Sequence, residues 1–409
     1  MEEWKEYRLG EVCDSISDTY KGKAAEVVLI NTSDVLEGKC LNHKKTPNKD
    51  LKGQFKKTFR KDDILYSEIR PANKRFAYID FEPLDYIAST KLMVIRSNEK
   101  IDSHYLFYIL KSQFMLDELQ MLAESRSGTF PQITFSELAN LSVILPNICK
   151  QKRILSILKS FDDKIEVNRR INENLEQQAQ ALFKSWFVDF EPFKNGEFVE
   201  SELGMIPKGW RIGELSEVGE IVGGSTPSKA RPDYYTNNGI AWLTPKDLSV
   251  SNCKFTAKGE IDITQEGYNS CSTKLMPKGT VLFSSRAPIG YITIAKNEIC
   301  TNQGFKSVVP QLAGTAFIYY FLKFSTKEIE NKATGSTFKE ASGALMKSLP
   351  TIIPISSVLD GFEELMEPIF RKQETLESES RRLAQLRDTL LPRLISGQIS
   401  LDYHNKNII

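Results

Sequence analysis

The feature that most constrains the fold is an internal repeat. Residues 126–146 read RSGTFPQITFSELANLSVILP, and residues 334–354 read TGSTFKEASGALMKSLPTIIP. Both stretches contain a small-residue turn, a Thr-Phe pair, a largely amphipathic segment, a short apolar run and a final proline. The phenylalanines at 130 and 338 are 208 residues apart, and so are the prolines at 146 and 354. This constant shift indicates that one structural frame occurs twice in the chain.

A long helix is predicted after each copy of the repeat. Residues 152–187 contain neither glycine nor proline, and apolar side chains recur there at alternating spacings of three and four. That periodicity predicts a long helix with a coiled-coil face. The same positions shifted by 208 residues form a second, largely apolar face. We call the two faces the seam, whose apolar members are Leu158, Phe161, Ile165, Leu175, Leu182, Trp186, Met366, Ile369, Leu376, Leu383, Leu390 and Leu394.

The polar interruptions of the seam fall at different places in the two helices. Ile165 corresponds to Gln373, and Asn168 corresponds to Leu376. Faces that differ in this way suit pairing with each other better than two identical self-pairing helices, so we expect an antiparallel or crossed pair within one chain. The alternative is two independent amphipathic helices, each packed on its own domain.

The starts and middles of the two halves also match, but with other shifts. The stretch YRLGEV at Tyr7 parallels WRIGEL at Trp210, 203 residues later. The stretch LYSEIRP at Leu65 parallels LFSSRAP at Leu282, 217 residues later. The second half therefore gains about fourteen residues early and loses about nine later, while the helices keep their length. Two recognition domains that share a framework but bind through different sequences would show this repeated frame with a variable middle.

Each half is predicted to be a mixed α/β domain followed by a long helix. Short runs such as VVLI, KLMVIRS, TVLFSSR and GYITIA are typical of strands, and residues 103–122 and 314–333 are typical of helices. The expected fold class is α/β (mixed α+β), with two similar domains, two long helices that pair as a coiled coil, and a pseudo-repeat of about 205 residues. The predicted boundaries are a first domain at 1–149, a central helix at 150–190, a linker at 191–209, a second domain at 210–355, a C-terminal helix at 356–400 and a tail at 401–409.

Composition narrows the class of protein. Apolar residues make up 41% of the chain and charged residues 26%, as in globular proteins. No apolar run is long enough for a membrane span, and MEEWKEYRLGEV at the N-terminus lacks the pattern of a signal peptide, so we expect a cytoplasmic protein. The six cysteines are scattered without a CxxC pair, and only three histidines occur, which leaves little material for a disulfide framework or a metal site.

The sequence contains no recognisable catalytic motif. The stretch GMIPKGW has tryptophan where a phosphate-binding loop needs lysine. There is no Asn/Asp-Pro-Pro-aromatic tetrapeptide of the kind found in amino methyltransferases, and no carboxylate cluster with a lysine that would suit a nuclease. The motifs GxSxG and HExxH are also missing. We therefore expect a non-catalytic protein without a metal site.

A lysine-rich run in the first half is the clearest binding candidate. Residues 42–61 carry eight basic residues and one acid, Asp50, in a chain whose net charge is +1. Such a local patch is what a phosphate backbone selects, although a solvated loop is the alternative. The second half has a thinner counterpart, diluted by Glu260 and Asp262. The phosphate-binding candidates in these segments are Lys44, Lys45, Lys49, Lys52, Lys56, Lys57, Arg60, Lys254 and Lys274.

Base reading requires fork-shaped or amide side chains on projecting loops. The stretches EIRPANKRF and LFSSRAPIG supply such side chains, and the small-residue turns of the repeat offer further donors to phosphates. For the two arginines that begin these loops, the alternative is an internal salt bridge. The base-reading candidates are Arg70, Asn73, Lys74, Arg75, Ser284, Ser285 and Arg286, and the candidates at the turns are Ser127, Thr129, Ser336, Thr337 and Lys339.

Taken together, this layout resembles the specificity (S) subunit of type I restriction-modification systems. The resemblance covers nearly the whole chain and rests on the order of EYRLGEV, VLFSSRAPIG, IPKGWRIGELSEV, LFKSWFVDFEP, LRDTLLPRLISGQISL and the two repeat ends along the two halves. One motif departs from the pattern, because EIRPANKRFAY lacks the Arg-x-Pro-x-Gly form of SRAPIGY. Loop contacts of the second domain therefore transfer less well to the first.

The resemblance implies two target-recognition domains joined by two long helices, with each domain reading one half of a split double-stranded DNA target. It implies that the helices set the gap between the halves and dock two methyltransferase (modification) subunits, and that two restriction (translocase-nuclease) subunits complete the complex. S-adenosylmethionine, ATP and magnesium would be bound by those partners, and no cofactor by this chain. A helix of about 36 residues is ~50 Å long, which exceeds the ~34 Å turn of B-DNA and suits half-sites about a turn apart.

Three other interpretations remain open from the sequence. The chain could serve a related system in which cleavage and methylation share one polypeptide. A catalytic enzyme fused to a single recognition domain is a second interpretation, and the missing motifs count against it. The third is a coiled-coil scaffold that does not bind DNA, which the lysine-rich run at 42–61 argues against.

Overall fold

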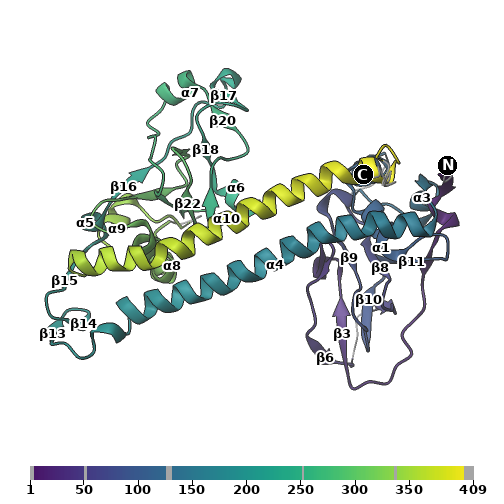
Figure 1. The fold of residues 1–409 in the computed structure, drawn as a ribbon, viewed down its shortest axis with the longest axis horizontal. Coiled ribbons are helices and arrows are strands. Elements are labelled where there is room, and N and C mark those ends of the chain that lie inside the picture. Colours follow the sequence, from purple (N-terminus) through teal and green to yellow (C-terminus); the bar gives the residue numbers. More distant parts are fainter. Residues whose placement is uncertain (1–3, 50–52, 126–130, 251–252, 336–338, 400–409) are drawn as a thin grey trace, which may run out of the picture. The chain divides into compact units, whose positions relative to one another are not determined.

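The fold was analysed in a computed structural model that describes residues 4–49, 53–125, 131–250, 253–335 and 339–399. The contacts divide the chain into two compact units, unit 1 with Met1–Ile165 and Arg382–Ile409, and unit 2 with Glu166–Arg381. Each unit holds one globular domain and part of each long helix (Figure 1). Among the described residues, no helix is both long enough and apolar enough to cross a membrane.

Unit 1 is built on two four-stranded sheets, of strand order β6-β3-β10-β7 and β2-β11-β8-β9. Strand β11 separates two hydrophobic cores, because alternate side chains of a strand point to opposite faces. Met93 and Ile95 pack with the helices α1 and α2, whereas Leu92 and Val94 pack with β3. The elements of unit 1 before the long helix are β1 (Lys5–Arg8), β2 (Cys13–Ile16), β3 (Glu26–Ile30), β4 (Val35–Leu36), β5 (Lys39–Cys40), β6 (Lys45–Pro47), β7 (Phe55–Lys57), β8 (Ile64–Ser67), β9 (Phe76–Tyr78), β10 (Tyr86–Ser89), β11 (Leu92–Ser97), α1 (Ser103–Leu110), α2 (Gln113–Glu124), α3 (Phe135–Ala139) and β12 (Ser142–Leu145).

Unit 2 is built on a five-stranded sheet of order β16-β24-β21-β22-β19, against which α8 packs. The predicted linker contains the hairpin β13–β14, and smaller pairs form from β17 with β20 and from β18 with β23. The elements are β13 (Phe198–Ser201), β14 (Gly204–Pro207), β15 (Arg211–Glu214), α5 (Leu215–Val218), β16 (Gly219–Gly223), β17 (Tyr235–Thr236), β18 (Trp242–Leu243), α6 (Pro245–Val250), β19 (Phe255–Thr256), β20 (Asp262–Ile263), α7 (Gln265–Asn269), β21 (Val281–Ser285), β22 (Ile289–Ala295), β23 (Cys300–Thr301), β24 (Lys306–Pro310), α8 (Thr315–Lys332), α9 (Gly343–Lys347) and β25 (Pro350–Ile353). The long helices are α4 (Ile148–Phe187) and α10 (Ser356–Ile395).

The repeated motifs at the start and the end of each domain pair with each other. In unit 1, β1 lies antiparallel to β12, with Tyr7 opposite Val143. In unit 2, β15 lies antiparallel to β25, with Ile212 opposite Ile352. The two motifs therefore recur together because each supplies one strand of the same two-stranded sheet.

The two remaining repeated motifs also contact each other. In unit 1, Ile133 N donates a hydrogen bond to Glu68 O at 2.9 Å, and in unit 2, Ala341 N donates to Ser285 O at 2.9 Å. The donors are 208 residues apart and the acceptors 217, as are the motifs that contain them. The same backbone hydrogen bond therefore joins the equivalent motifs in both domains. We call the paired terminal strands, this hydrogen bond and the long helices the shared frame.

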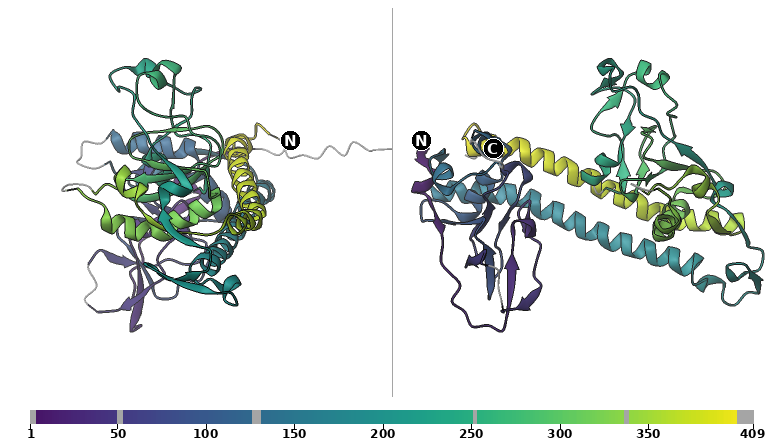
Figure 2. Two further views of the ribbon diagram at one scale, coloured as in Figure 1. Left: turned by 90° about the vertical axis from the view of Figure 1, so that its left-hand side faces the viewer. Right: turned by 180° about the vertical axis from the view of Figure 1, so that it is seen from behind.

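Within each unit, the long helices lie side by side and run antiparallel (Figures 1 and 2). In unit 2, Asn168 Nδ2 donates to Ser380 Oγ at 3.3 Å, and Gln373 Nε2 donates to Asn172 O at 3.4 Å. Residue numbers thus fall along α10 as they rise along α4. The predicted antiparallel pair is confirmed, and the alternative of two independent helices is wrong.

The helices bury more than the seam, because a second face of each packs on the globular domains. Phe183, Phe187 and Phe362 lie outside the seam and are buried among the aromatic side chains of unit 2, where the rings of Phe187 and Phe362 are 4.8 Å apart. In unit 1, Leu155 of α4 and Leu391 of α10 also lie outside the seam and are buried in the core of the domain. Of the twelve seam residues, eight are half-buried, and the fully buried ones are Leu158, Met366, Leu376 and Leu394.

A buried lysine joins the second domain to both helices of unit 2. The ammonium of Lys254 lies 2.9 Å from Glu176 Oε2 of α4 and 2.9 Å from Gln373 Oε1 of α10. Tyr320 OH of α8 is 2.6 Å from it, and Glu176 also binds Lys323 of α8 at 2.6 Å. Only 7% of the Lys254 side chain is exposed, and a charge buried to this extent needs partners within the protein. Glu176 supplies the compensating charge. The prediction that Lys254 binds phosphate is therefore wrong.

A related contact occurs in unit 1. Tyr108 and Lys111 stand 212 residues before Tyr320 and Lys323. Both bind the carboxylate of Asp162 on α4, the lysine at 3.1 Å, and this carboxylate also pairs with an arginine of α10. Each domain therefore presents a Tyr-x-x-Lys pair to one carboxylate of α4. The Tyr-x-x-Lys pair is thus a further repeated motif, which is not among those predicted from the sequence.

Replacing Glu176 with glutamine is expected to destabilise the protein by about 3 kcal/mol at pH 7, because Lys254 stays buried without its counter-charge. Burial alone would raise the pKa of the Glu176 carboxyl, but Lys254 and Lys323 lower it to about 2. A carboxyl with a lowered pKa stabilises the fold above its unfolded value of 4.5 and loses that contribution as the pH falls toward 2. Free energies of unfolding from urea titrations of the two proteins should therefore converge as the pH falls through this window.

The matched control is Glu173→Gln, on the same helix. The Glu173 side chain is 57% exposed and pairs with Arg169 four residues earlier. Removing an exposed pair of this kind costs at most about 0.5 kcal/mol. Equal losses for Glu173→Gln and Glu176→Gln would show that the buried cluster adds no special stability.

Candidate nucleic-acid interface

The lysine-rich run supplies both edge strands of one sheet in unit 1. Lys45 lies on β6 and Lys56 on β7, at the two ends of the strand order β6-β3-β10-β7. Lys57 is half-buried, donates to Leu92 O at 2.8 Å, and has its ammonium pKa lowered by burial. Lys57 therefore has a structural role. The described candidates of the run that are exposed are Lys44, Lys45, Lys49, Lys56 and Arg60.

The hairpin loop between β8 and β9 holds four base-reading candidates, which differ in their contacts and in their exposure. Arg75 Nη1 donates to a backbone carbonyl at 3.1 Å, and Lys74 Nζ lies 3.6 Å from a carboxylate oxygen of Glu37. Arg70 and Asn73 are exposed, and the left-handed backbone of Arg70, with φ of 46°, starts the turn. Arg75 thus holds the domain's own backbone, whereas Arg70 and Asn73 lie on the surface.

Two candidates of unit 2 are buried in strand β21. Ser284 Oγ donates to Pro288 O at 2.8 Å and accepts from Tyr291 N at 2.8 Å. Ser285 Oγ donates to Gly304 O at 3.2 Å. Neither serine is exposed, because β21 continues through both residues before the chain turns. The prediction that Ser284 and Ser285 project from a loop and read bases is therefore wrong.

Arg286 follows β21 directly and remains 36% exposed. Its Nη1 lies 3.5 Å from Glu340 Oε2, while Lys306 Nζ lies 3.3 Å from the other oxygen of the same carboxylate. The internal salt bridge considered as the alternative for this arginine is thus present. Since two cations share one carboxylate, positive charge remains at this edge of the domain.

The other phosphate candidates of unit 2 lie on the surface. Lys274 is exposed and lies 3.5 Å from a carboxylate oxygen of Glu220. Lys339 is exposed and donates to Glu330 O at 3.3 Å. The candidates that lie outside the described residues are Lys52, Ser127, Thr129, Ser336 and Thr337.

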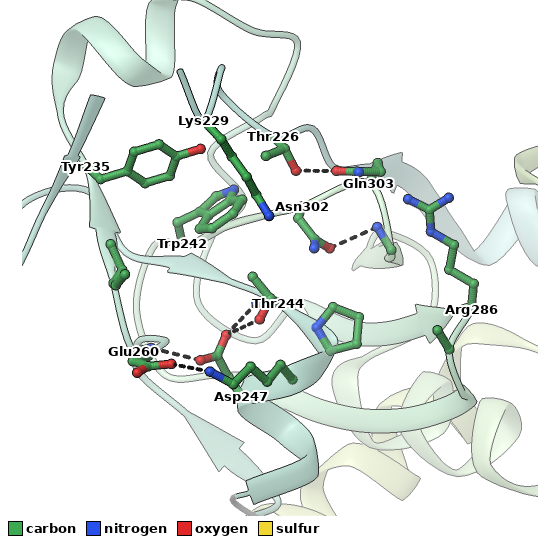
Figure 3. A pocket seen from close by; sticks show the side chains of 15 residues that line it. Thr226, Lys229, Tyr235, Trp242, Thr244, Asp247, Glu260, Arg286, Asn302 and Gln303 are labelled. Carbon is green, nitrogen blue, oxygen red and sulfur yellow. Dashed lines mark hydrogen bonds and ion pairs between the residues drawn. The ribbon is translucent and has the colours of Figure 1, made fainter. Parts of the chain in front are cut away.

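An open pocket of about 630 Å³ lies beside Arg286 in unit 2 (Figure 3). Its walls come from the loop before β17, from β18 and the start of α6, from residues 260–261, and from the loop after β23. The first three segments lie between β16 and β21, where the second half has about fourteen more residues than the first. The pocket is therefore built largely from chain that the two domains do not share.

The aromatic side chains of the pocket have their polar atoms satisfied inside the domain. Trp242 Nε1 donates to Ser225 O at 3.1 Å, and Tyr235 OH donates to Pro227 O at 2.6 Å. The two rings pack edge to face, with centroids 6.0 Å apart. These contacts fix an apolar surface in the pocket.

The acidic wall of the pocket is also engaged with the domain. Asp247 Oδ2 accepts from Thr244 N and Oγ1, both at 2.7 Å, and Oδ1 accepts from Glu260 N at 2.9 Å. Glu260 pairs with Lys246 at 3.0 Å. Across the described residues, no group of three or more His, Cys, Asp or Glu side chains is arranged to hold a metal ion. The acids of this wall therefore shape the pocket.

The remaining polar groups of the pocket are donors. Asn302 Oδ1 accepts from Gly304 N at 2.9 Å, and Gln303 Oε1 accepts from Thr226 Oγ1. In the part of the chain that the structure describes, the amide NH2 groups of both side chains and the ammonium of Lys229 have no hydrogen-bond partner. Figure 3 shows Lys229 extending over the pocket. Sequence reasoning missed these residues, since they lie about 70 positions apart in no known motif.

Comparisons with known proteins identify both halves of the chain. The family model of the type I restriction modification DNA specificity domain matches residues 1–177 and again residues 207–377. The chain is 34% identical to the type I restriction enzyme HindI specificity subunit of Haemophilus influenzae, over 98% of this chain and 100% of that one. It is 38% identical to the type I restriction enzyme MjaIX specificity subunit of Methanocaldococcus jannaschii over 44% of each chain. The type I restriction-modification S subunit from M. genitalium shares the fold, with a TM-score of 0.56 over 96% of each chain at 16% identity.

Four exposed lysines of unit 1 are expected to set the salt dependence of duplex DNA binding. Each phosphate that a protein neutralises contributes about 0.9 to the slope of log affinity against log salt. If all four contact phosphates, their replacement should flatten that slope by about 3.6 and weaken binding to every sequence. Fluorescence anisotropy with labelled duplexes between about 50 and 200 mM salt measures the slope. The substitutions are Lys44→Gln, Lys45→Gln, Lys49→Gln and Lys56→Gln.

A double variant of the linker tests whether the loss of lysine charge outside the two sheet edges has the same effect. Lys194 pairs with Glu191 at 2.6 Å, and Lys208 pairs with Glu197 at 2.6 Å. Replacing both lysines with glutamine should leave the slope unchanged. The same slope in the parent and the fourfold variant would show that the two sheet edges do not contact DNA.

Proposed function

The chain belongs to the family of type I restriction-modification specificity subunits, and on that premise we propose that it selects a split DNA target, with one half read by each globular domain. The observation that carries the proposal is the repeat. The shared frame occurs twice, whereas the segments between its motifs differ in length and content. Two equivalent frames that position different binding segments suit two different half-sites.

The two domains offer complementary kinds of surface for such a target. Unit 1 has exposed lysines on the edges of one sheet, together with Arg70 and Asn73 on a hairpin loop. Unit 2 has a pocket in which amide and cationic donors face an apolar wall. Lysines on a sheet edge suit the DNA backbone, which is bound without regard to sequence, while arginine, lysine and amide side chains that reach a groove distinguish base edges. Each unit thus has groups suited to specific recognition.

We assign the spacing of the half-sites and the docking of partner subunits to the long helices. Each helix runs through the boundary between the two units, so both contribute to the connection between the domains. Several large apolar side chains stay exposed on them, and exposed apolar groups of this kind suit a protein partner. Those residues are Val167, Ile171, Leu365 and Leu386. In the proposed complex the partners are two methyltransferase subunits and two restriction subunits.

We place the chemistry of this complex on the partner subunits. S-adenosylmethionine would serve the methyltransferase subunits, and ATP and magnesium the restriction subunits. The sequence of this chain has no catalytic motif for methyl transfer, hydrolysis of DNA or nucleotide binding. A related system in which one partner polypeptide carries cleavage and methylation would use a specificity subunit in the same way, and the presence of a fused partner gene beside this one distinguishes the two arrangements.

The proposed function is tested by co-expressing the chain with its methyltransferase subunit and mapping methylated adenines across the host genome. The expected result is a motif of two short defined halves with a fixed unspecified gap. A single continuous motif would overturn the assignment of one half-site to each domain. If a complex shown to be assembled methylates no site, the chain is a scaffold and not a specificity subunit.

Exchange of Val199–Ser348 for the matching segment of another specificity subunit is expected to change one half of the motif and leave the other intact. The exchange removes most of the second domain but keeps α4 and α10. Its donor segment should contain a lysine equivalent to Lys254 and a Tyr-x-x-Lys pair equivalent to Tyr320 and Lys323, so that Glu176 keeps its partners. Methylation mapping gives the outcome, and a chimera in which both halves change would contradict the proposal.

A further inference from the structure

We propose that the pocket of unit 2 binds the major-groove edge of a guanine in the half-site read by the second domain. The inference deepens the proposed function and rests on it. It follows from three properties of the pocket: which hydrogen-bonding groups are free, where the acids lie, and which part of the chain forms the walls.

The free hydrogen-bonding groups of the pocket are donors. Asn302 and Gln303 use their carbonyl oxygens within the domain, at Gly304 N and Thr226 Oγ1, so that their NH2 groups face the pocket. The ammonium of Lys229 carries only donors, and so does the guanidinium at position 286. On the opposite wall, both oxygens of Asp247 accept hydrogen bonds from the domain, and Glu260 pairs with Lys246 through Oε2. The wall formed by Lys229, Asn302 and Gln303 therefore suits a ligand that brings acceptors.

Guanine is the base that matches such a site. Its major-groove edge presents two acceptors, N7 and O6, whereas adenine presents one acceptor and one donor, and cytosine a donor. Thymine offers one acceptor beside a methyl group. Two donors of the pocket wall, the NH2 of Gln303 and the ammonium of Lys229, match the two acceptors of guanine in number, and one of them would be left unused at any other base.

A DNA phosphate also brings acceptors, but the acidic wall disfavours it. Asp247 and Glu260 line the same pocket as the donors. Lys246 balances the charge of Glu260, so the carboxylate of Asp247 is the one that repels a phosphate anion, because like charges interact unfavourably at short range in a partly enclosed site. A guanine edge is neutral and does not meet that repulsion.

The position of the pocket agrees with a role in distinguishing one half-site from the other. Lys229 and the two aromatic residues belong to the segment between β16 and β21, where the second half is longer than the first. The shared frame holds this segment without fixing its content. A base-specific site in that segment therefore gives the second domain a preference that the first need not share.

The test uses the complex of this chain with its methyltransferase subunit and the split target found by methylation mapping. Duplexes carry 7-deazaguanine, which lacks the N7 acceptor, at one guanine at a time in the half that changes in the Val199–Ser348 exchange. With the parent protein, one such substitution is expected to weaken binding about 10-fold, which corresponds to about 1.4 kcal/mol. In whichever of Gln303→Ala and Lys229→Met removes the partner of N7, that duplex should bind as well as the unmodified one, whereas the variant that removes the partner of O6 should keep the response.

The same variants should also relax the methylated motif at that one position, with the other half unchanged. Lys229 and Gln303 are exposed, so their substitution leaves the fold intact. Lys347→Met is the matched control, because Lys347 is an exposed lysine of α9 outside the pocket. It should retain the parent's motif and the parent's response to 7-deazaguanine.

Two results would overturn the assignment of the pocket. Weaker binding of Lys229→Met to every sequence, with a flatter salt dependence, together with no response of the parent protein to 7-deazaguanine, would identify a phosphate as the ligand. A split motif in which no guanine of that half responds to the modified base would rule out guanine reading. Either result leaves the proposed function standing, whereas a continuous motif would overturn the proposed function itself.

Discussion

The carboxylate of Glu176 is the point on which the arrangement of the second domain depends. It binds Lys254 and Lys323 of that domain while it sits on α4, and Lys254 reaches Gln373 on α10 at the same time. Burial of these charges is costly unless every partner is in place, so alternative positions of the domain on the helices leave a lysine or a carboxylate unpaired. The cluster thereby selects one geometry for the domain on the helix pair.

The first domain meets α4 through the same chemistry. Tyr108 and Lys111 bind Asp162, fourteen positions before Glu176 on the helix. Fourteen residues are two heptads, so both carboxylates occupy the same heptad position in the sequence of α4. The repeat therefore extends to the way in which each domain is attached. The segments that remain free to vary lie away from these attachment points, and the pocket of unit 2 is formed there.

Burial decides which of the predicted DNA-binding residues lie on the surface and which have a structural role. The sequence placed Lys254, Ser284 and Ser285 among the DNA-binding candidates because their residue types and stretches fit that role. Tertiary packing instead surrounds them with partners of the protein itself, and Lys57 and Arg75 also bind backbone carbonyls. No local pattern distinguishes a lysine that faces solvent from one that neutralises a carboxylate on a distant helix. The pocket donors were missed for the same reason, since Lys229 and Gln303 line one pocket only in the folded domain.

The sequence by itself determined the duplicated architecture, the two long helices, their pairing and the family. These features rest on periodicity and on the order of motifs, which are properties of the chain read in one dimension. Tertiary structure alone decided that the repeated motifs touch each other, which faces of the helices pack on the domains, and which polar groups stay free to bind. Those outcomes depend on contacts between residues far apart in sequence, such as Glu176 with Lys323, and on the burial that follows from them. Hydrogen-bonding capacity is consumed wherever such contacts form, so the proposed binding surface consists of the donors that the fold itself leaves unused.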